Sequence, residues 1–450
     1  MTYPDTGTRA TYLAILIIGT IVLYYQLYIA GAVAPKILSG DGLSFPFYLY
    51  IMVISNALGA FGSLAAGLAD RWGRANLVAY GLLATGSLAA FAIPNVSGKW
   101  GFAVVLAIIG YIGGIILVAT PALVRDYTQQ LGRSTAMGIW ALGPVIGSLA
   151  VAVVSSSTLP HLHPWQDQFV ISGLVALGIG LVAVIGLREL SPHVRDEFTE
   201  ALRARAVAEA RSRGTDLEEI ISRPWRRVLR LDVVGPAFGI SVFQLVYCTA
   251  VTCLTLYLTV LHGLTLTSAN SLGDWLWAFA AGAAIVTGVV SDLVRVRKPF
   301  MIIGAVGAIV MMIVFARLGP GTSYSTFAVV LSALGVFVAI AYAPWLASFT
   351  ETLDRLSPAL AAAGLAVWGW ITRAVIAVAL LVLPLVVGSM TAAAAGQWRT
   401  WWWVCVAGQV VFVPTIFLMP GRWNPRKARQ EAEEHERVIQ RELEELRAEP

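Results

Sequence analysis

The ten residues at 67–76, GLADRWGRAN, decide how the rest of the chain is interpreted. They follow an apolar stretch from 45 to 66 that has no charged side chain, and they place Asp70, Arg71 and Arg74 within five positions. Such a stretch is long enough to cross the hydrocarbon core of a bilayer, which takes about 20 apolar residues. The charges that follow it therefore indicate a membrane helix that ends at a water interface.

The composition extends this interpretation to the whole chain. Of its 450 residues, 58% are hydrophobic and 13% are charged, and the mean hydropathy is +0.75. Soluble domains contain about 25% charged residues. Long apolar runs favour helices over the short alternating strands of a β-barrel. The sequence predicts an all-α membrane protein with twelve transmembrane helices, at 11–33, 45–68, 77–94, 100–123, 137–157, 169–187, 233–259, 269–290, 300–316, 325–348, 361–388 and 401–419.

The basic residues sort to one side of the membrane. With twelve spans and the N-terminus inside, the cytoplasmic segments hold 26 of the 31 Lys and Arg residues. Because positive charge favours the cytoplasmic side, both termini are expected in the cytoplasm, in a bacterial-type plasma (inner) membrane. The excess of basic residues is thus explained by the membrane, and the lipid bilayer is the expected partner. No nucleic acid partner is expected.

The chain also contains an internal repeat. Asp70 and Asp292 each follow the second span of a half and lie 222 positions apart, and Pro121 and Pro344 lie 223 apart. Repeats of this kind are typical of secondary transporters, whose binding site lies between the repeated halves. We therefore expect two pseudo-symmetric bundles of six helices. The predicted domains are an N-terminal bundle at 1–187, a charged cytoplasmic linker at 188–231, a C-terminal bundle at 232–420 and a charged helical tail at 421–450.

The stretch from Gly67 to Arg74 closely resembles the loop signature of the major facilitator superfamily, and the segment from Asp292 to Lys298 resembles its degenerate second copy. The resemblance implies the major facilitator fold and a gating role for Asp70, which would help to lock the cytoplasmic gate when the protein faces outward. Arg125, at the end of the fourth span, is the expected partner in a salt bridge. The alternative is that these charges only set the topology. The predicted gating residues are Asp70, Arg71, Arg74, Arg125 and Asp292.

The fifth span carries Gly143-Pro144 and, shortly after it, Gly147-Ser148. The segment resembles the Gly-Pro motif of antiporters in the superfamily but departs from its glycine spacing. The preferred interpretation is structural: a helix that bends and has a thin face for close packing.

Arg373 is the one charged residue in the central part of a predicted span. A charge at that depth costs about 3 kcal/mol or more, so such a residue usually faces a cavity or has a partner. We interpret it as the binding residue for an anionic group, with Trp370 three positions earlier on the same helix face. The alternative is a structural ion pair, for which Asp274 near the outer end of the eighth span is the candidate.

Amides and phenols supply the other candidate ligands. In the superfamily the first and seventh helices line the central cavity. The first span contains a polar aromatic run from Tyr24 to Tyr28, and the seventh contains Gln244 and Tyr247. Such groups at midplane depth suit a polar or aromatic substrate, although each could equally join neighbouring helices. The predicted substrate-binding residues are Tyr25, Gln26, Gln244, Tyr247, Trp370 and Arg373.

These residues predict a secondary active transporter of a small organic solute. An organic or aromatic anion is the favoured substrate, and proton coupling is an expectation that comes from the superfamily. One alternative is a proton antiporter that exports toxic compounds, and a more remote one is a transporter-like membrane sensor. Cofactors and metals are not expected, because the sequence contains no phosphate-binding loop or metal-ligand spacing. A catalytic pair at a common depth is also missing from the sequence, so an enzyme is not expected.

Overall fold

The computed structural model describes most of the predicted spans and little of the charged segments. The described residues are 5–40, 43–64, 73–128, 133–162, 164–189, 228–294, 296–356, 361–388, 390–419, 423 and 437. Asp70 and Arg71 lie outside these residues, as do most of the predicted linker and tail. No strand occurs among the described residues.

Within the described residues, twelve groups of helices coincide with the twelve predicted spans. Those of the first half are α1 (Thr6–Gly40), α2 (Phe45–Leu64), α4 (Arg74–Ser87) with η1 (Leu88–Ala92) and α5 (Ile93–Asn95), α6 (Gly98–Tyr127), α7 (Arg133–Ala141) with α8 (Gly143–Thr158), and α9 (Gln166–Gly186). Those of the second half are α13 (Leu231–Phe243) with α14 (Leu245–His262), α15 (Leu266–Val294), α16 (Lys298–Ala316), α17 (Tyr324–Leu356), α18 (Ala361–Val387), and η3 (Ala392–Ala394) with α19 (Ala395–Ile416).

The helices are long enough for membrane spans. Within the described residues, ten helices are long and apolar enough to cross a bilayer, and α8 is a shorter apolar helix. The helix α19 adds 22 residues at the position of the twelfth predicted span. The predicted all-α membrane fold is confirmed.

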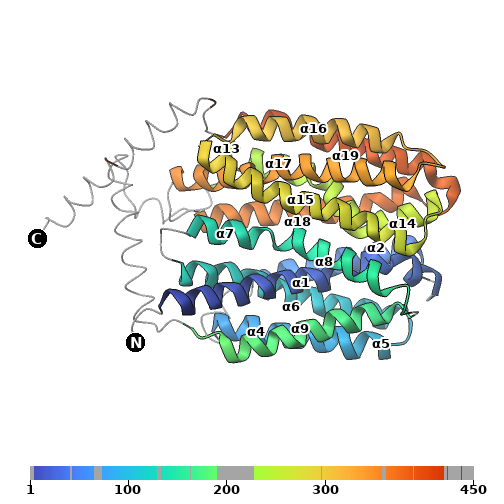
Figure 1. Ribbon diagram of the computed structural model, residues 1–450, viewed down its shortest axis with the longest axis horizontal. Helices are drawn as coiled ribbons and strands as arrows, with labels where there is room; N and C mark the ends of the chain where they lie inside the picture. The colour runs from blue at the N-terminus through green and yellow to red at the C-terminus, as the bar shows by residue number, and fades with distance from the viewer. Residues whose placement is uncertain are drawn as a thin grey trace, which may run out of the picture.

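The two halves lie side by side, with the second half above the first in Figure 1. We call the end at which α1 begins the proximal end, on the left of Figure 1, and the opposite end the distal end. Within the first half α2 packs on α6, and α4 and α1 pack on α9. Within the second half α17 packs on α15 and α16, and α13 packs on α18 and α19. The halves meet where α1 contacts α14, α8 contacts α15 and α2 contacts α18.

The fifth span is broken at the predicted Gly-Pro segment. Leu142 separates α7 from α8, and Pro144 lies in the first turn of α8. A Cβ atom on Gly147 would lie 2.6 Å from the Cβ atom of Tyr24, so α8 approaches α1 closely there. The segment therefore provides both features of the structural interpretation, a break and a thin packing face.

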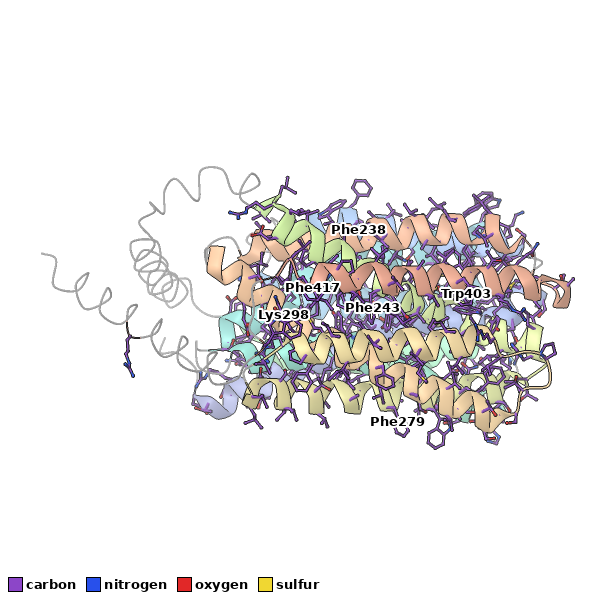
Figure 2. The ribbon with its side chains drawn as sticks, turned by 90° about the horizontal axis from the view of Figure 1, so that it is seen from above. Phe238, Phe243, Phe279, Lys298, Trp403 and Phe417 are labelled. Atoms are coloured by element: carbon purple, nitrogen blue, oxygen red, sulfur yellow. The ribbon has the colours of Figure 1, made fainter. Side chains whose placement is uncertain are left out.

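The seventh span is broken as well, at Gln244 between α13 and α14. Around the bundle, the outward faces of the spans are apolar. Phe238, Phe279 and Trp403 are between 41% and 45% exposed, and Figure 2 shows Phe279 at the edge of the bundle. Phe243 lies in the interior and is fully buried. Exposed aromatic residues on membrane spans are the expected contacts with lipid.

Candidate functional site

A group of polar aromatic side chains lies between the halves at mid-depth. Tyr24 and Tyr28 are one turn apart on α1, with ring centroids 5.4 Å apart. The ring of Tyr28 lies 6.3 Å from that of Tyr247, at the start of α14. All three side chains are half-buried, whereas their neighbours Tyr25 and Gln26 are buried. The face of α1 that carries Tyr24 and Tyr28 is therefore the one that meets the second half.

Tyr247 connects this group to α8 and α15. Its hydroxyl lies 3.2 Å from the hydroxyl of Ser148 on α8, within hydrogen-bonding distance. Its ring packs edge-on against Trp277 of α15, with centroids 5.2 Å apart. Tyr247 thus contacts residues from both halves, so its environment depends on how far apart the halves are.

The break at Gln244 brings a further polar group to the same level. The Gln244 side chain lies close to the Tyr342 hydroxyl on α17. Both residues are half-buried. Because a broken helix places its side chains at an angle to the axis of the span, the amide of Gln244 reaches a neighbouring helix at the centre of the bundle.

Arg373 completes this group on α18. Its side chain is half-buried, and a Cβ atom on Gly59 of α2 would lie 3.3 Å from its Nη1 atom. Tyr24 and Tyr28 are close enough to interact with it electrostatically. Among the described residues no carboxylate forms an ion pair with it. The guanidinium group therefore sits at mid-depth between the halves, beside phenols and without a described acidic partner. We call Tyr24, Tyr28, Gln244, Tyr247, Tyr342 and Arg373 the central cluster.

Three of the six predicted substrate-binding residues, Gln244, Tyr247 and Arg373, lie in the central cluster. Gln26 instead accepts a hydrogen bond of 2.9 Å from the Thr85 hydroxyl of α4, inside the first half. Tyr25 is 3% exposed, and its hydroxyl has no hydrogen-bond partner.

Trp370 also lies away from the cluster. Its side chain is 43% exposed, on a stripe of α18 that continues at four-residue spacing through the exposed residues Ala374 and Val378. A stripe of that spacing is one face of a helix. Trp370 therefore shares the outward face of α18 rather than the face that carries Arg373.

Asp274 does not pair with Arg373. Its Oδ2 atom accepts a hydrogen bond of 3.0 Å from the hydroxyl of Ser156, at the distal end of α8. The ion pair that the sequence offered as an alternative role for Arg373 is therefore not formed.

From the sequence, Tyr24 and Tyr28 belong to the polar aromatic run of the first span and Tyr342 is a weaker cavity candidate on the tenth, but none of the three is among the six predicted substrate-binding residues. A signal was present for the first two, because their spacing of four residues puts them on one helix face. On a helix with 3.6 residues per turn, Tyr25 lies about a quarter turn from the centre of that face and Gln26 about half a turn from it. The role of Tyr342 depends on the position of α17 in space, for which the sequence contains no comparable signal.

Of the predicted gating residues, Arg74 and Asp292 are described with their side chains. Arg74 donates from Nη1 to both carboxylate oxygens of Asp126, at 3.2 and 2.9 Å. In the second half Arg297 forms ion pairs with Asp292 and with Glu351, the latter at 3.0 Å. Asp70, Arg71 and the side chain of Arg125 lie outside the described residues.

The two ion pairs are related by the internal repeat. Arg74 and Arg297 each stand at the start of the third helix of a half and lie 223 positions apart. Asp126 and Glu351 each lie near the end of the fourth, 225 positions apart. Burial opposes the charge on Arg297, but Glu351 and Asp292 outweigh it and raise the pKa of the guanidinium above its usual value. Each pair joins two helices of the same half.

At the distal end the halves are in close contact. A Cβ atom on Gly31 of α1 would collide with the backbone carbonyl of Val251 on α14. The Tyr48 hydroxyl donates to the carbonyl of Thr252 at 3.2 Å, and the Asn270 amide donates to the carbonyl of Ala32 at 3.1 Å. The structure is therefore closed on the distal side of the central cluster.

Comparison with known proteins places this arrangement in a family. The family model described as Major Facilitator Superfamily matches residues 16–375. The chain belongs to the major facilitator superfamily. It is accordingly a transporter rather than an enzyme, and it takes a small-molecule substrate through a membrane. No curated protein sequence matches it significantly, so a subfamily is not identified.

Solved structures of the superfamily share the fold of this chain. A bacterial homologue of the human lysosomal transporter Spinster, inward-facing and unoccupied, is 14% identical, with a TM-score of 0.65 over 92% of this chain and 97% of that one. A D-xylose–proton symporter is 15% identical, with a TM-score of 0.66 over 91% and 96%. The xylose transporter XylE from E. coli, partially occluded and inward open, is 13% identical, with a TM-score of 0.66 over 92% and 98%.

Within the described residues, no group of three or more His, Cys, Asp and Glu side chains could hold a metal ion. The three cysteines, Cys248, Cys253 and Cys405, are free and buried.

Proposed function

We propose that this member of the superfamily is a secondary active transporter of a small organic anion, and that it works by alternating access. The anionic group, a carboxylate, binds Arg373, and the phenols of the central cluster contact the remainder of the substrate. The supporting observation is a guanidinium group at mid-depth that has no described acidic partner. Since an uncompensated charge in a membrane costs about 3 kcal/mol or more, a ligand that neutralises it is strongly favoured.

The phenols favour an aromatic acid among the organic anions. Rings of Tyr24, Tyr28 and Tyr247 follow one another at centroid separations of 5.4 and 6.3 Å. Aromatic pairs at such separations are worth about 0.5–1.5 kcal/mol beyond the area that they bury. An aromatic ring held beside this series by a carboxylate on Arg373 would make contacts of the same kind.

We also propose which end of the bundle faces the cytoplasm. The proximal end is cytoplasmic, and the membrane is a bacterial-type plasma membrane, because the basic residues of the sequence gather on the side of the chain termini. Asp70, Arg71, Arg74, Arg125 and Asp292 form the proximal gate in this proposal. Arg74 and Asp292 already stand at helix ends there, each in an ion pair.

Binding of benzoate to the purified protein tests the anion site. A ligand that binds only the folded protein raises its melting temperature, so the thermal shift reports affinity. Benzoate is expected to stabilise the protein, and the uncharged D-xylose, named for one structural neighbour, is expected to have no effect. Arg373→Gln removes the charge and leaves a shorter side chain that ends in a neutral amide, and it should weaken benzoate binding by about tenfold or more, since hydrogen bonds to charged groups contribute about 1.5–3 kcal/mol.

The matched control is Arg399→Gln, because Arg399 is an exposed residue at the start of α19. This variant should bind benzoate as the unmodified chain does. Equal affinity of Arg373→Gln and the unmodified chain would refute the anion site. Stabilisation by cationic drugs instead of organic acids would favour the exporter, and binding without flux in proteoliposomes would favour a sensor.

A further inference from the structure

A small cavity lies between the halves on the distal side of the central cluster. Its volume is about 30 Å³, which is room for a group of about the size of a water molecule. Helices α1 and α8 of the first half and α14 and α15 of the second enclose it, and each of these helices packs on at least two of the others. We call this space the distal cavity. Its lining includes Tyr28, Ser148, Thr255, Asn270, Gly273 and Trp277.

The amide of Asn270 has a fixed orientation at the wall of the distal cavity. Asn270 is 3% exposed. Its Nδ2 atom donates to the carbonyl of Ala32 at 3.1 Å and to the carbonyl of Leu266 at 2.9 Å. Because an amide nitrogen carries two protons, these two hydrogen bonds use its whole donor capacity. The oxygen is therefore the atom of this amide that remains available to the cavity.

That oxygen can accept a further hydrogen bond. An amide oxygen has two lone pairs, and the one described donor to Oδ1 of Asn270 is the Thr255 hydroxyl, at 3.4 Å. Hydroxyl donors usually lie about 2.7–2.8 Å from their acceptors, so this hydrogen bond is long and weak. Both side chains are buried. A buried acceptor that is only partly satisfied favours a ligand group that donates a hydrogen bond.

The size of the distal cavity limits that ligand group. The cavity cannot widen beside Gly273 unless α8 and α15 separate, because a Cβ atom on Gly273 would lie 3.1 Å from the Cβ atom of Ala152. A hydroxyl group fits a space of about 30 Å³, whereas a substituent of several heavy atoms does not. A methyl group is of similar size but donates no hydrogen bond. Size and polarity together therefore select a hydroxyl group.

Tyr28 connects the distal cavity to the central cluster. Its side chain lines the cavity and is close enough to Arg373 to interact with it electrostatically. Ala32, which also lines the cavity, lies one turn further along α1, at about 6 Å for four residues of about 1.5 Å each. The guanidinium group and the cavity therefore lie on two sides of the Tyr28 ring. A ligand that reaches both needs a spacer of roughly the size of one aromatic ring.

We propose that the distal cavity receives a hydroxyl group of the substrate, which donates a hydrogen bond to Oδ1 of Asn270. The substrate is then an aromatic acid with a hydroxyl group on the opposite side of the ring from the carboxylate. The inference rests on the proposed function, in which the carboxylate binds Arg373. It adds a second point of recognition, which selects among aromatic acids by a group that Arg373 does not contact.

Binding of substituted benzoates to the unmodified chain tests the distal cavity. At neutral pH 4-hydroxybenzoate and 4-methylbenzoate both carry an ionised carboxylate, and the phenol keeps its proton. Their substituents have similar size and the same position. The additional hydrogen bond should make 4-hydroxybenzoate bind about twofold to tenfold more tightly than 4-methylbenzoate. Titration of the thermal shift gives both affinities. The larger substituent of 4-methoxybenzoate should weaken binding below that of either.

Asn270→Leu removes the acceptor at a similar side-chain volume. This substitution also removes the hydrogen bonds to Ala32 and Leu266, so it lowers the stability of the protein as a whole. The readout is therefore the ratio of the two affinities within the variant, from which a general loss of stability cancels. The preference for 4-hydroxybenzoate over 4-methylbenzoate should fall to about one.

Ala250→Val tests the cavity without touching the acceptor. Ala250 lines the distal cavity, and the larger side chain takes up part of its space. The affinity for 4-hydroxybenzoate relative to benzoate should therefore fall, since benzoate has no substituent in the cavity. The matched control is Ala278→Val on α15, because Ala278 is exposed and is not part of the lining. This control should retain the full preference for 4-hydroxybenzoate.

Two outcomes would overturn the hydroxyl site. One is equal affinity of the unmodified chain for 4-hydroxybenzoate and 4-methylbenzoate while benzoate binds, which would leave the anion site and identify the cavity as a packing defect. The other is a preference that survives both Asn270→Leu and Ala250→Val. The proposed function fails in a different way. If benzoate does not bind, but 4-methylphenol stabilises the unmodified chain and not Ala250→Val, the anion site is refuted and the hydroxyl site stands.

Discussion

The interface between the halves differs between its two ends. At the distal end the contacts cross from one half to the other, and they involve backbone atoms: Gly31 against Val251, and hydrogen bonds to the carbonyls of Thr252 and Ala32. At the proximal end the described ion pairs of Arg74 and Arg297 each join two helices of the same half. At the distal end the halves are joined by close backbone packing, whereas the proximal ion pairs lie within each half.

This difference indicates how the two ends act in transport. Backbone-to-backbone contact needs close approach and tolerates no additional atom, so it is either fully made or lost. Ion pairs within a half keep the ends of its helices together and persist while the halves move as units. We therefore expect the distal contacts to decide which state is populated, and the proximal pairs to stabilise the fold of each half.

Filling the space at Gly31 should have the largest effect. Gly31→Val places a branched side chain where even a Cβ atom collides with the carbonyl of Val251. Overpacking of this kind costs about 1–3 kcal/mol, which is about a fivefold to hundredfold shift away from the closed state. Nitroxide labels at Ser157→Cys on α8 and Ser325→Cys on α17, both exposed, report the distal separation of the halves in a chain whose native cysteines are replaced. The distance between these labels should lengthen, and substrate flux should fall. Gly282→Ala on α15, where nothing lies within 4 Å, is the control and should change neither quantity. An unchanged distance in Gly31→Val would show that the contact at Gly31 does not hold the distal end closed.

Breaking a proximal ion pair should lower the free energy of unfolding. The loss should be larger where the carboxylate that remains is more deeply buried. Arg74→Ala leaves Asp126, whose side chain is 16% exposed, so a loss of about 2–3 kcal/mol in the free energy of unfolding is expected. Arg297→Ala leaves Glu351, which is 50% exposed and remains hydrated, so a loss of about 1 kcal/mol in the free energy of unfolding is expected. The exposed pair of Arg230 and Asp232 should contribute less than either, and Arg230→Ala is the control. Thermal unfolding in detergent gives the order, and the reverse order would contradict this account of the proximal end.

Neutralising the predicted gate acid should have the smallest effect. If Asp70 helps to lock the proximal end when the distal end is open, Asp70→Asn destabilises that state and increases the closed distal fraction. One exposed charge interaction contributes about 0.5–1 kcal/mol, which is about a twofold to fivefold change. The labels at positions 157 and 325 measure it. Asp5→Asn, at the start of α1, is a control for the general effect of removing a negative charge near the proximal end. A shift toward the open distal state would reverse the role assigned to Asp70.

The fold could be predicted from the sequence because the membrane imposes a strong and simple pattern. Each span must be apolar over its length, and the loops must carry the charges, so twelve segments were visible without any knowledge of their packing. The repeat was visible for a similar reason. Asp70 and Asp292 mark equivalent loops, and the ion pairs of Arg74 and Arg297 repeat at nearly the same separation.

The site could be predicted only in part. Arg373 was visible because a charge is rare within a span, and Gln244 and Tyr247 because polar groups are few there. The spacing of Tyr24 and Tyr28 places them on one face of α1, but hydrophobicity does not show which face of α1 meets the second half. This helix is apolar on all sides and buries residues around its whole circumference, so no amphipathic pattern distinguishes the face of Tyr24 and Tyr28 from that of Tyr25 and Gln26. Which face meets the second half is decided by packing between distant segments, including the approach of α8 at Gly147.

The break at Gln244 has a consequence for the size of the moving part. It divides the seventh span into α13, which packs on α18 and α19, and α14, an 18-residue helix that carries the contacts with Gly31 and Tyr48. If this break acts as a hinge, α14 can tilt at the distal end while α13 stays packed on α18 and α19. The segment that moves would then be α14 alone, whose 18 residues make a helix about 27 Å long at about 1.5 Å per residue. Because α14 is largely buried, such a movement would change its packing on α1 and α15 inside the bundle.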